Sequence, residues 1–285
     1  MLELDFSQAP QIPEGFVMGM SEKEYRAVDA ISQSNLKTLI TEPFKFFNKI
    51  EIEQTESMIE GTLLHLLFSA PHSVEEQFFI TEAKKITDSV KMEANGKPIV
   101  KKEKYQTLID CVDYTKEFMF KYHQIDLDLM DSEVSYFGKY NGYNAKGRAD
   151  KITDNRRGIF DFKKTKSAKP RDFIKTACDL HYGIQEVFYR ELMGVEKFEW
   201  IAIETTPMKN AMGKSFFMID RFESTPQLME ASKILIETAF EILEKPEIYS
   251  QPIYPDEFIR NEVAIGREKI KKVVPPMWYI AHCGI

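Results

Sequence analysis

Charged residues stand inside two runs that otherwise favour β-strands. "GRADKI" (147–152) contains Asp150 between two basic residues, and "GIFDFKK" (158–164) contains Asp161 and Lys163. Neighbouring carboxylates raise each other's pKa unless a positive charge lies between them. Mg²⁺ or Mn²⁺ suits such oxygen ligands, and a lysine beside the ion can orient or help deprotonate an attacking water. The pattern favours metal-assisted hydrolysis at a phosphate; a surface ladder of salt bridges is the alternative.

The strand register decides whether these side chains meet. A two-residue turn centred on Asn155-Arg156 would place Asp150 directly opposite Asp161, with Cβ atoms about 4.5–5.5 Å apart. Lys163 lies two residues after Asp161, so its side chain points to the same face of the sheet. The turn therefore predicts one face that carries both acids and the lysine.

A second turn adds a third carboxylate to this face. Asn141-Gly142 is the strongest kind of short hairpin signal, and a turn there pairs Glu133 with Asp150. Three carboxylates would then lie side by side on adjacent strands. A register slip of one residue would move Glu133 to the other face, so its assignment depends mainly on this pairing.

The elements that must position these residues follow from apolar spacing and from turn residues. We expect a serine-capped helix that stops before Pro43, an apolar helix that ends at Pro71, a helix over 104–123, a three-strand meander from Glu133 to about Lys164, one long amphipathic helix from about Pro170 to Met193, strands over 197–206 and 214–220, and a helix from about Pro226 to Glu244. Residues 72–105 show no clear period, which indicates a mobile excursion. The order predicts an α/β fold around a mixed central sheet with an antiparallel meander.

The length of 285 residues fits one large domain better than two independent ones. Residues 1–30 contain prolines without a sustained period and are expected to form an extended arm. Residues 31–285 then form a single domain. We divide it into a helical part at about 31–130, a sheet with its helices at about 131–250, and a C-terminal extension at 251–285.

Composition excludes several classes of protein. No apolar run approaches the roughly 20 residues of a membrane helix, and the N-terminus lacks the pattern of a secretory signal, so a cytoplasmic location is expected. Cys111, Cys178 and Cys283 are far apart and odd in number. They predict buried reduced thiols and neither a disulfide framework nor a cysteine metal site.

Charge is distributed unevenly along the chain. The net charge is −7, yet residues 146–175 contain eleven basic and four acidic residues, a net +7 that leaves −14 for the remainder. Such a segment can attract a polyanion even in an acidic protein. The alternative is a solvated lysine-rich loop.

Five segments together resemble the RecE-type exonuclease VIII group of the PD-(D/E)XK nucleases, which is related to the RecB nuclease domain. They are "ISQSNLKTLITEPFKF", "GTLLHLL", "GRADKI", "FDFKKT" and "HYGIQEVFY". The last four are similar to the group's Gly-x-x-x-His, Arg-x-Asp, Asp-x-Lys-x-Thr and Tyr-x-x-Gln-x-x-x-Tyr segments. The resemblance runs from about Ala30 to Thr206 and departs at Lys164, where a threonine is common.

This resemblance implies a PD-(D/E)XK core and assigns roles to individual residues. The metal site would comprise His65, Asp150, Asp161 and Phe162, with Glu133 added from the strand pairing. The catalytic residues would be Lys163, Asp150 and Asp161, supported by Gln185 and Tyr189. The basic segment and the face of the following helix give the expected DNA contacts: Arg148, Lys164, Lys166, Lys169, Arg171 and Tyr182.

The activity that the resemblance implies is a Mg²⁺-dependent exodeoxyribonuclease, with Mn²⁺ as a substitute, that degrades one strand of double-stranded DNA from its end in the 5′ to 3′ direction. It also implies a ring-shaped homo-oligomer and a single-strand annealing protein as the partner in recombination. Two alternatives remain: a structure-specific or repair endonuclease on the same core, and a DNA-binding or assembly protein that has lost cleavage.

Overall fold

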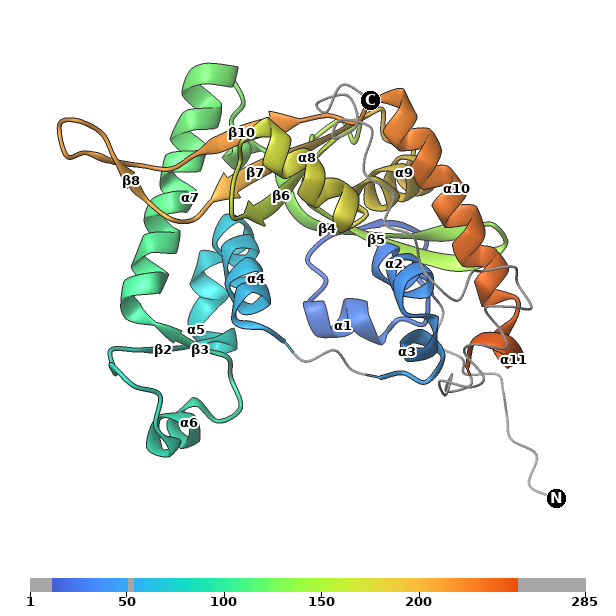
Figure 1. The fold of residues 1–285 in the computed structure, drawn as a ribbon, viewed down its shortest axis with the longest axis horizontal. Coiled ribbons are helices and arrows are strands. Elements are labelled where there is room, and N and C mark those ends of the chain that lie inside the picture. Colours follow the sequence, from blue (N-terminus) through green and yellow to red (C-terminus); the bar gives the residue numbers. More distant parts are fainter. Residues whose placement is uncertain (1–11, 51–53, 251–285) are drawn as a thin grey trace, which may run out of the picture.

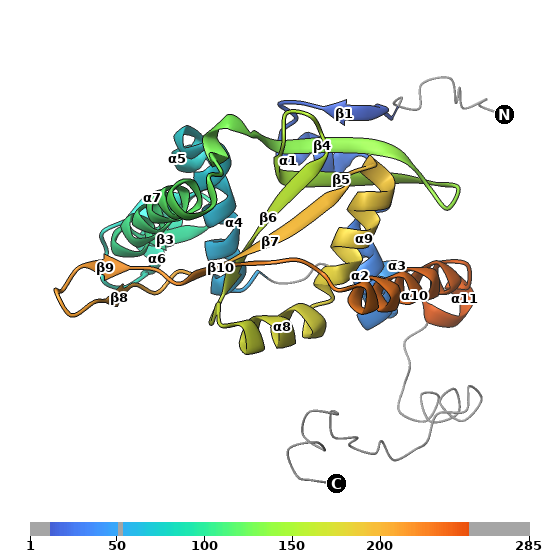
Figure 2. The same ribbon diagram turned by 90° about the horizontal axis from the view of Figure 1, so that it is seen from above.

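A six-stranded sheet crosses the middle of the molecule in the order β1-β4-β5-β6-β7-β10 (Figure 1 and Figure 2). The computed structural model describes residues 12–50 and 54–250. The strands of the sheet are β1 (Gly15–Val17), β4 (Asp131–Tyr140), β5 (Tyr143–Ile152), β6 (Gly158–Thr165), β7 (Lys197–Glu204) and β10 (Ile219–Phe222). Within this sheet β6 and β7 run parallel and the other neighbours antiparallel. The mixed sheet and its antiparallel meander are as predicted.

Helices cover both faces of the sheet. The helices of the described residues are α1 (Glu22–Ala27), α2 (Gln33–Thr41), α3 (Pro43–Phe47), α4 (Glu56–Ser69), α5 (Val74–Gln77), α6 (Asp88–Ala94), α7 (Lys102–His123), α8 (Pro170–Asp179), α9 (Tyr182–Met193), α10 (Pro226–Leu243) and α11 (Pro246–Tyr249). Two small ribbons accompany them, β2 (Phe79–Thr81) with β3 (Ile99–Lys101), and β8 (Met208–Lys209) with β9 (Ser215–Phe216).

Two hydrophobic cores lie on opposite sides of the sheet. Helices α2, α8, α9 and α10 pack on one face, where Trp200 and Ala202 point. Helices α4 and α7 pack on the other, where Ile201 and Ile203 point. Strand β7 is thus buried on both faces, which explains its nearly continuous apolar sequence.

The hairpin between β4 and β5 has the predicted register. Tyr140 pairs with Tyr143 around Asn141-Gly142, whose φ angles are 47° and 82°. Positive φ at both central residues is the geometry that an Asn-Gly pair adopts most readily. The short turn therefore fixes which residues of β4 lie beside Asp150.

The register between β5 and β6 is also as predicted, although the turn is longer. Lys151 pairs with Phe160 and Ile152 with Ile159. The Thr153 N–H donates to the Gly158 carbonyl at 2.9 Å, so four residues form the loop in place of the expected two. Only these two pairs form a β-ladder within the described strands, and the two strands separate before they reach Asp150.

The prediction of a mobile excursion over residues 72–105 is wrong. This segment contains α5, β2, α6 and β3, and buried side chains such as Val74, Phe78 and Val100 fix it to the core under α4 and α7. Its strands have three residues each, too few to produce a period in the sequence.

The single long helix expected over 170–193 is two helices. α8 ends at Asp179, and His181 has φ 51° before α9 begins at Tyr182. The break lets α9 lie close against α10: a Cβ atom at Gly183 would stand 2.2 Å from Ser232 Oγ. Packing between α9 and α10 therefore places the residues of α9.

The N-terminal segment is more structured than an extended arm. Residues 15–17 form β1 on the edge of β4, and Ser21 caps α1 through a capping box with Glu24. The first eleven residues and the expected C-terminal extension 251–285 lie outside the described residues.

None of the described helices combines the length and the apolar composition that crossing a membrane requires. Cys111 is buried, Cys178 is exposed against expectation, and Cys283 lies outside the described residues.

Candidate active site

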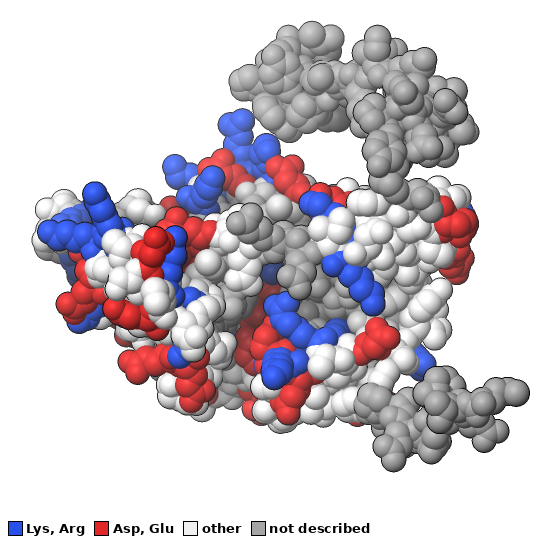
Figure 3. Space-filling view, turned by 90° about the horizontal axis from the view of Figure 1, so that it is seen from below, with Lys and Arg blue, Asp and Glu red and all other residues white. Residues whose placement is uncertain are grey.

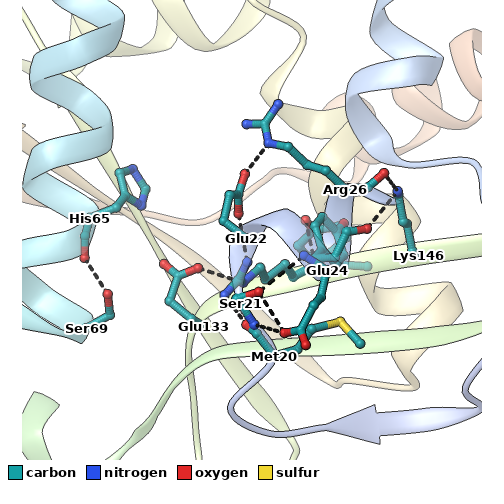
Figure 4. Close-up of polar contacts among 12 residues, drawn as sticks. Met20, Ser21, Glu22, Glu24, Arg26, His65, Ser69, Glu133 and Lys146 are labelled. Carbon is teal, nitrogen blue, oxygen red and sulfur yellow. Dashed lines mark hydrogen bonds and ion pairs between the residues drawn. The ribbon is translucent and has the colours of Figure 1, made fainter. Parts of the chain in front are cut away.

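Three side chains from different elements meet in one cleft. His65 lies on α4, which Thr55 caps, whereas Asp150 and Glu133 lie on the neighbouring strands β5 and β4. His65 Nδ1 is 3.1 Å from Asp150 Oδ2, and one ligand atom from each of the three residues lies within 4.8 Å of the others. Figure 4 shows His65 extending from α4 toward Glu133. An imidazole and two carboxylates at this spacing fit a divalent metal ion.

The backbone of β4 gives Glu133 its unusual position. Ser132 pairs with Lys151 and Val134 with Ala149, in the predicted register, while Glu133 between them has φ 50°. A left-handed conformation is uncommon for a residue other than glycine and is often found at functional sites. This conformation interrupts the regular pairing of β4 beside Asp150. The Glu133 side chain therefore reaches the site from an irregular point of the strand.

Protons would compete with a metal ion for these three side chains. Burial alone would lower the pKa of His65, but the Asp150 carboxylate raises it to about 9. Burial and the Asp150 charge raise the pKa of Glu133 to about 7. Burial opposes ionisation of Asp150, yet the charges of His65 and Lys163 hold its pKa below the usual range. Protonated His65 thus compensates the acids in the apoprotein, and a metal ion would take over this role while the protons leave.

Asp161 lies outside the trio and is bound by two other residues. Lys163 Nζ is 2.5 Å from Asp161 Oδ2, and Gln185 Nε2 donates to Asp161 Oδ1 at 2.6 Å. Lys163 also donates to Gln185 Oε1 at 2.9 Å, and its ammonium lies 4.8 Å from the centre of the Tyr182 ring. Burial would lower the pKa of Lys163, but the charges of Asp161 and Asp150 raise it. This lysine is therefore a fixed cation.

Gln185 holds both members of the Asp161–Lys163 pair, so its loss should reduce activity without removing a charge. If the cleft performs the DNA cleavage that the sequence resemblance implies, Gln185→Leu should lower its rate roughly 10- to 100-fold, as for loss of a residue that orients the reacting groups. Gln106→Leu, on the exposed face of α7, is the matched control. Single-turnover cleavage measures the effect, and equal rates for the two variants would contradict this role.

Tyr189 supports β5 through its hydroxyl. The Arg148 backbone N–H donates to Tyr189 Oη at 3.1 Å. α9 approaches β5 closely at Gly147, where a Cβ atom would stand 2.4 Å from the Met193 side chain and 3.0 Å from the Tyr189 ring. Tyr189 is 4% exposed and lines the cleft, where its hydroxyl supports the backbone of β5.

Phe162 contributes through its backbone. Its N–H donates to Asp150 Oδ2 at 2.8 Å, which fixes the carboxylate that also contacts His65. Its ring points away from the site and stacks on Phe68 with ring centres 3.8 Å apart. A role in metal binding would therefore fall to its carbonyl oxygen and remains a prediction.

Arg148 was expected to contact DNA, but it holds the N-terminal segment in place. Its guanidinium lies 2.7 Å from Glu22 and 2.8 Å from Glu133, and it donates to the Met20 carbonyl at 2.8 Å. Lys146 beside it donates to the carbonyls of Tyr25, Arg26 and Val28 around the end of α1. Met20, Glu22, Lys146 and Arg148 line the cleft. Figure 4 shows Glu22, Met20 and Lys146 with their polar contacts.

The basic segment does not form one surface. Lys164 pairs with Glu60 at 2.9 Å and donates to Ser57 at 3.0 Å, both on α4, and its contact with DNA stays a prediction. Arg156 pairs with Asp131, Arg157 with Glu196, and Lys175 with Asp179. Lys166, Lys169 and Arg171 are exposed after β6, whereas Tyr182 is 9% exposed and contacts Lys163 and Lys37 with its ring. Basic residues that lie close together in the sequence therefore form separate ion pairs in different parts of the structure.

A cleft of about 1070 Å³ contains His65, Glu133, Asp150, Asp161 and Lys163. Its walls include α1, the start of α2 and residues of α4. Figure 3 shows a hollow on the face seen from below, with acidic and basic side chains close together around it.

One cation of the cleft was missed by the sequence interpretation. Lys37 follows the apolar residue Leu36 on α2 and resembles any solvent-facing lysine of an amphipathic helix. Its ammonium lies 5.3 Å from the centre of the Tyr182 ring. No local signal identifies it, because its neighbours in the site come from β6 and α9.

Comparison with known proteins agrees with this geometry. Residues 32–204 match the family described as a PDDEXK-like domain of unknown function (DUF3799). No curated protein matches the sequence. A solved structure from Eubacterium rectale, of a protein described as a candidate exonuclease, is similar with a TM-score of 0.53 at 15% identity, covering 93% of this chain and 99% of the other. At that identity the likeness shows the fold.

A phage-related exonuclease from Haemophilus somnus 129PT is also similar, with a TM-score of 0.30 at 13% identity, over 72% of this chain and 99% of the other. The family match spans more than half of the chain, from the start of α2 to the end of β7, and includes every residue of the trio and of the Asp161–Lys163–Gln185 group. The chain therefore belongs to the PDDEXK-like family.

Proposed function

We propose that this protein is a Mg²⁺-dependent deoxyribonuclease that hydrolyses phosphodiester bonds, with Mn²⁺ as a substitute ion. The observation that carries the proposal is the combination, in one cleft, of a trio able to hold a divalent ion and a fixed lysine beside it. A structural salt-bridge ladder does not require this arrangement, in which an imidazole and two carboxylates converge within an open cleft and a buried lysine–carboxylate pair lies beside them.

The side chains of this protein orient the reacting groups and supply positive charge to the phosphate. Hydrolysis joins a water oxygen to phosphorus and breaks the bond to the leaving oxygen, so negative charge grows on the phosphate. Lys163, fixed by Asp161 and Gln185, can neutralise that charge and orient the water. Because the pKa of Lys163 is raised, it acts here as a cation and a donor and not as a base. A bound divalent ion would supply Lewis-acid polarisation and a more nucleophilic water.

The substrate and partners in this proposal are double-stranded DNA ends, degraded in the 5′ to 3′ direction by a ring-shaped homo-oligomer in the cytoplasm that acts with a single-strand annealing protein in recombination. These features come from the motif resemblance. The solved protein of similar fold, which is described as a candidate exonuclease, supports the preference for DNA ends. The exposed Lys166, Lys169 and Arg171 are proposed to contact phosphates. A structure-specific or repair endonuclease and a DNA-binding protein without cleavage are the alternatives.

A cleavage assay on two forms of duplex DNA tests the proposal. We expect end-labelled linear duplex to be degraded with Mg²⁺ or Mn²⁺, closed circular duplex to stay intact, and all cleavage to stop in excess EDTA. Cleavage of the circle would indicate an endonuclease. Cleavage that persists in EDTA would contradict the metal-dependent mechanism, and binding without cleavage would favour the third alternative.

A further inference from the structure

Lys37 and Lys163 place two ammonium groups next to one aromatic ring. Lys37 Nζ lies 5.3 Å and Lys163 Nζ 4.8 Å from the centre of the Tyr182 ring. The three residues come from α2, β6 and α9, so the whole fold is needed to bring them together. A cation near a ring face gains roughly 0.5–2 kcal/mol, which helps to hold both groups there.

The two lysines differ in their partners. Lys163 pairs with Asp161 and Gln185. Within residues 12–50 and 54–250, no carboxylate lies within ion-pair distance of Lys37, and its ammonium makes no hydrogen bond. Lys37 nevertheless lines the cleft. It is a cation at the cleft with no ion-pair partner among the described residues, although the charge of Asp161 acts on it from a greater distance.

The local electrostatics are consistent with a missing anion. Burial, together with the charge of Lys163, lowers the pKa of Lys37 to about 7, while Asp161 opposes the shift. A phosphate oxygen beside Lys37 would offset the repulsion from Lys163 and stabilise the charged form of Lys37. Phosphate is the anion that a cleft for DNA would bring to this position.

We propose that Lys37 binds a non-bridging oxygen of the DNA phosphate that lies beside Lys163, as a second cationic contact of the candidate active site. This inference rests on the proposed nuclease function. Lys37 and Lys163 then approach the phosphate from α2 and β6, with the Tyr182 ring fixing both ammonium groups, while the metal trio lies on the side of α4 and β4. The contact is to the backbone, so it carries no base preference.

Four proteins are compared to test the inference: Lys37→Met, Lys37→Arg, and, as references, Lys91→Met and the unchanged protein. Lys91 is exposed on α6, outside the cleft lining, and its replacement removes the same charge. We measure duplex binding by fluorescence anisotropy in EDTA over a range of salt concentrations, steady-state cleavage with Mg²⁺, and the melting temperature.

Lys37→Met is expected to weaken DNA binding about 10-fold or more, the effect of losing one charge-assisted hydrogen bond. The slope of log affinity against log salt should become shallower by nearly one unit, as for one lost phosphate contact. Lys37→Arg should recover most of the affinity, and Lys91→Met should match the unchanged protein. The melting temperature of Lys37→Met should stay equal or rise, because the variant removes a charge that repels Lys163.

Two results would overturn the inference. One is a Lys37→Met protein with unchanged affinity and salt slope, and the other is a loss of affinity that accompanies a lower melting temperature and is not recovered in Lys37→Arg, which indicates a structural role. Failure of the proposed function looks different, because the unchanged protein itself would then fail to cleave DNA, whether or not it binds DNA.

Discussion

Asp150→Asn is expected to abolish divalent-metal binding and to reduce DNA cleavage by at least about 10²-fold. Asp150 is the residue that the other parts of the site share: its Oδ2 atom contacts His65 Nδ1 and accepts the Phe162 N–H. Asparagine keeps the size and one accepting oxygen, so the bond to Phe162 can persist. The change removes the negative charge that attracts the ion, and titration calorimetry with Mn²⁺ measures the loss directly.

The control for this change is Asp113→Asn, which removes the same charge from the exposed face of α7. It should bind Mn²⁺ and cleave DNA like the unchanged protein. If Asp150→Asn kept normal metal affinity, the trio of His65, Glu133 and Asp150 would not be the metal site. If metal binding were lost but cleavage stayed normal, catalysis would not depend on this ion.

Local signals were sufficient to predict the parts of the site that lie on neighbouring strands. The Asn141-Gly142 turn fixes the register of β4 and β5, and the polar loop after Ile152 fixes that of β5 and β6. Side chains alternate strictly along a strand, so each register determines which residues can share a face. This is why the amino-acid sequence alone predicts the pairing of β4 with β5 on either side of Glu133 and the two ladder pairs between β5 and β6.

Side chains no longer alternate between the two faces of the sheet where the backbone leaves regular strand geometry. Glu133 has φ 50° and meets Asp150 and His65 from an interrupted strand, while β5 and β6 separate beyond Lys151. Asp161 consequently turns to Lys163 and Gln185 and does not join the trio. Strain and strand separation depend on packing against α4 and α9, which a strand pattern does not contain.

The basic segment of the sequence did not predict where positive charge lies on the surface of the folded protein. Lys164 finds its partner, Glu60, more than one hundred residues away on α4, and Arg148 finds Glu22 on α1. Pairings of this kind are set by tertiary structure, so a count along the chain overestimates the basic surface. Lys37 was not predicted for the same reason, because its neighbours Tyr182 and Lys163 lie on α9 and β6.

Lys163→Met should leave metal binding intact while it reduces the rate of chemistry by on the order of 10²-fold or more. Lys163 is not part of the metal trio, so Mn²⁺ should bind equally well, or more tightly once a neighbouring cation is gone. The phosphate loses the cation that offsets its growing charge. Asp161 also loses its partner and should take up a proton, because burial already raises its pKa.

The loss of that buried pair is expected to lower the melting temperature, since removing one partner of a buried ion pair destabilises a protein by about 3–5 kcal/mol. Cleavage is therefore measured in single turnover at a temperature where circular dichroism shows the variant to be folded. Lys164→Met is the matched control: its ammonium pairs with Glu60 on α4 and lies outside the cleft, so it should lose stability but keep its rate. If Lys164→Met lost cleavage and Lys163→Met kept it, the register of β6 and the assignment of Lys163 as the lysine of the site would both be wrong.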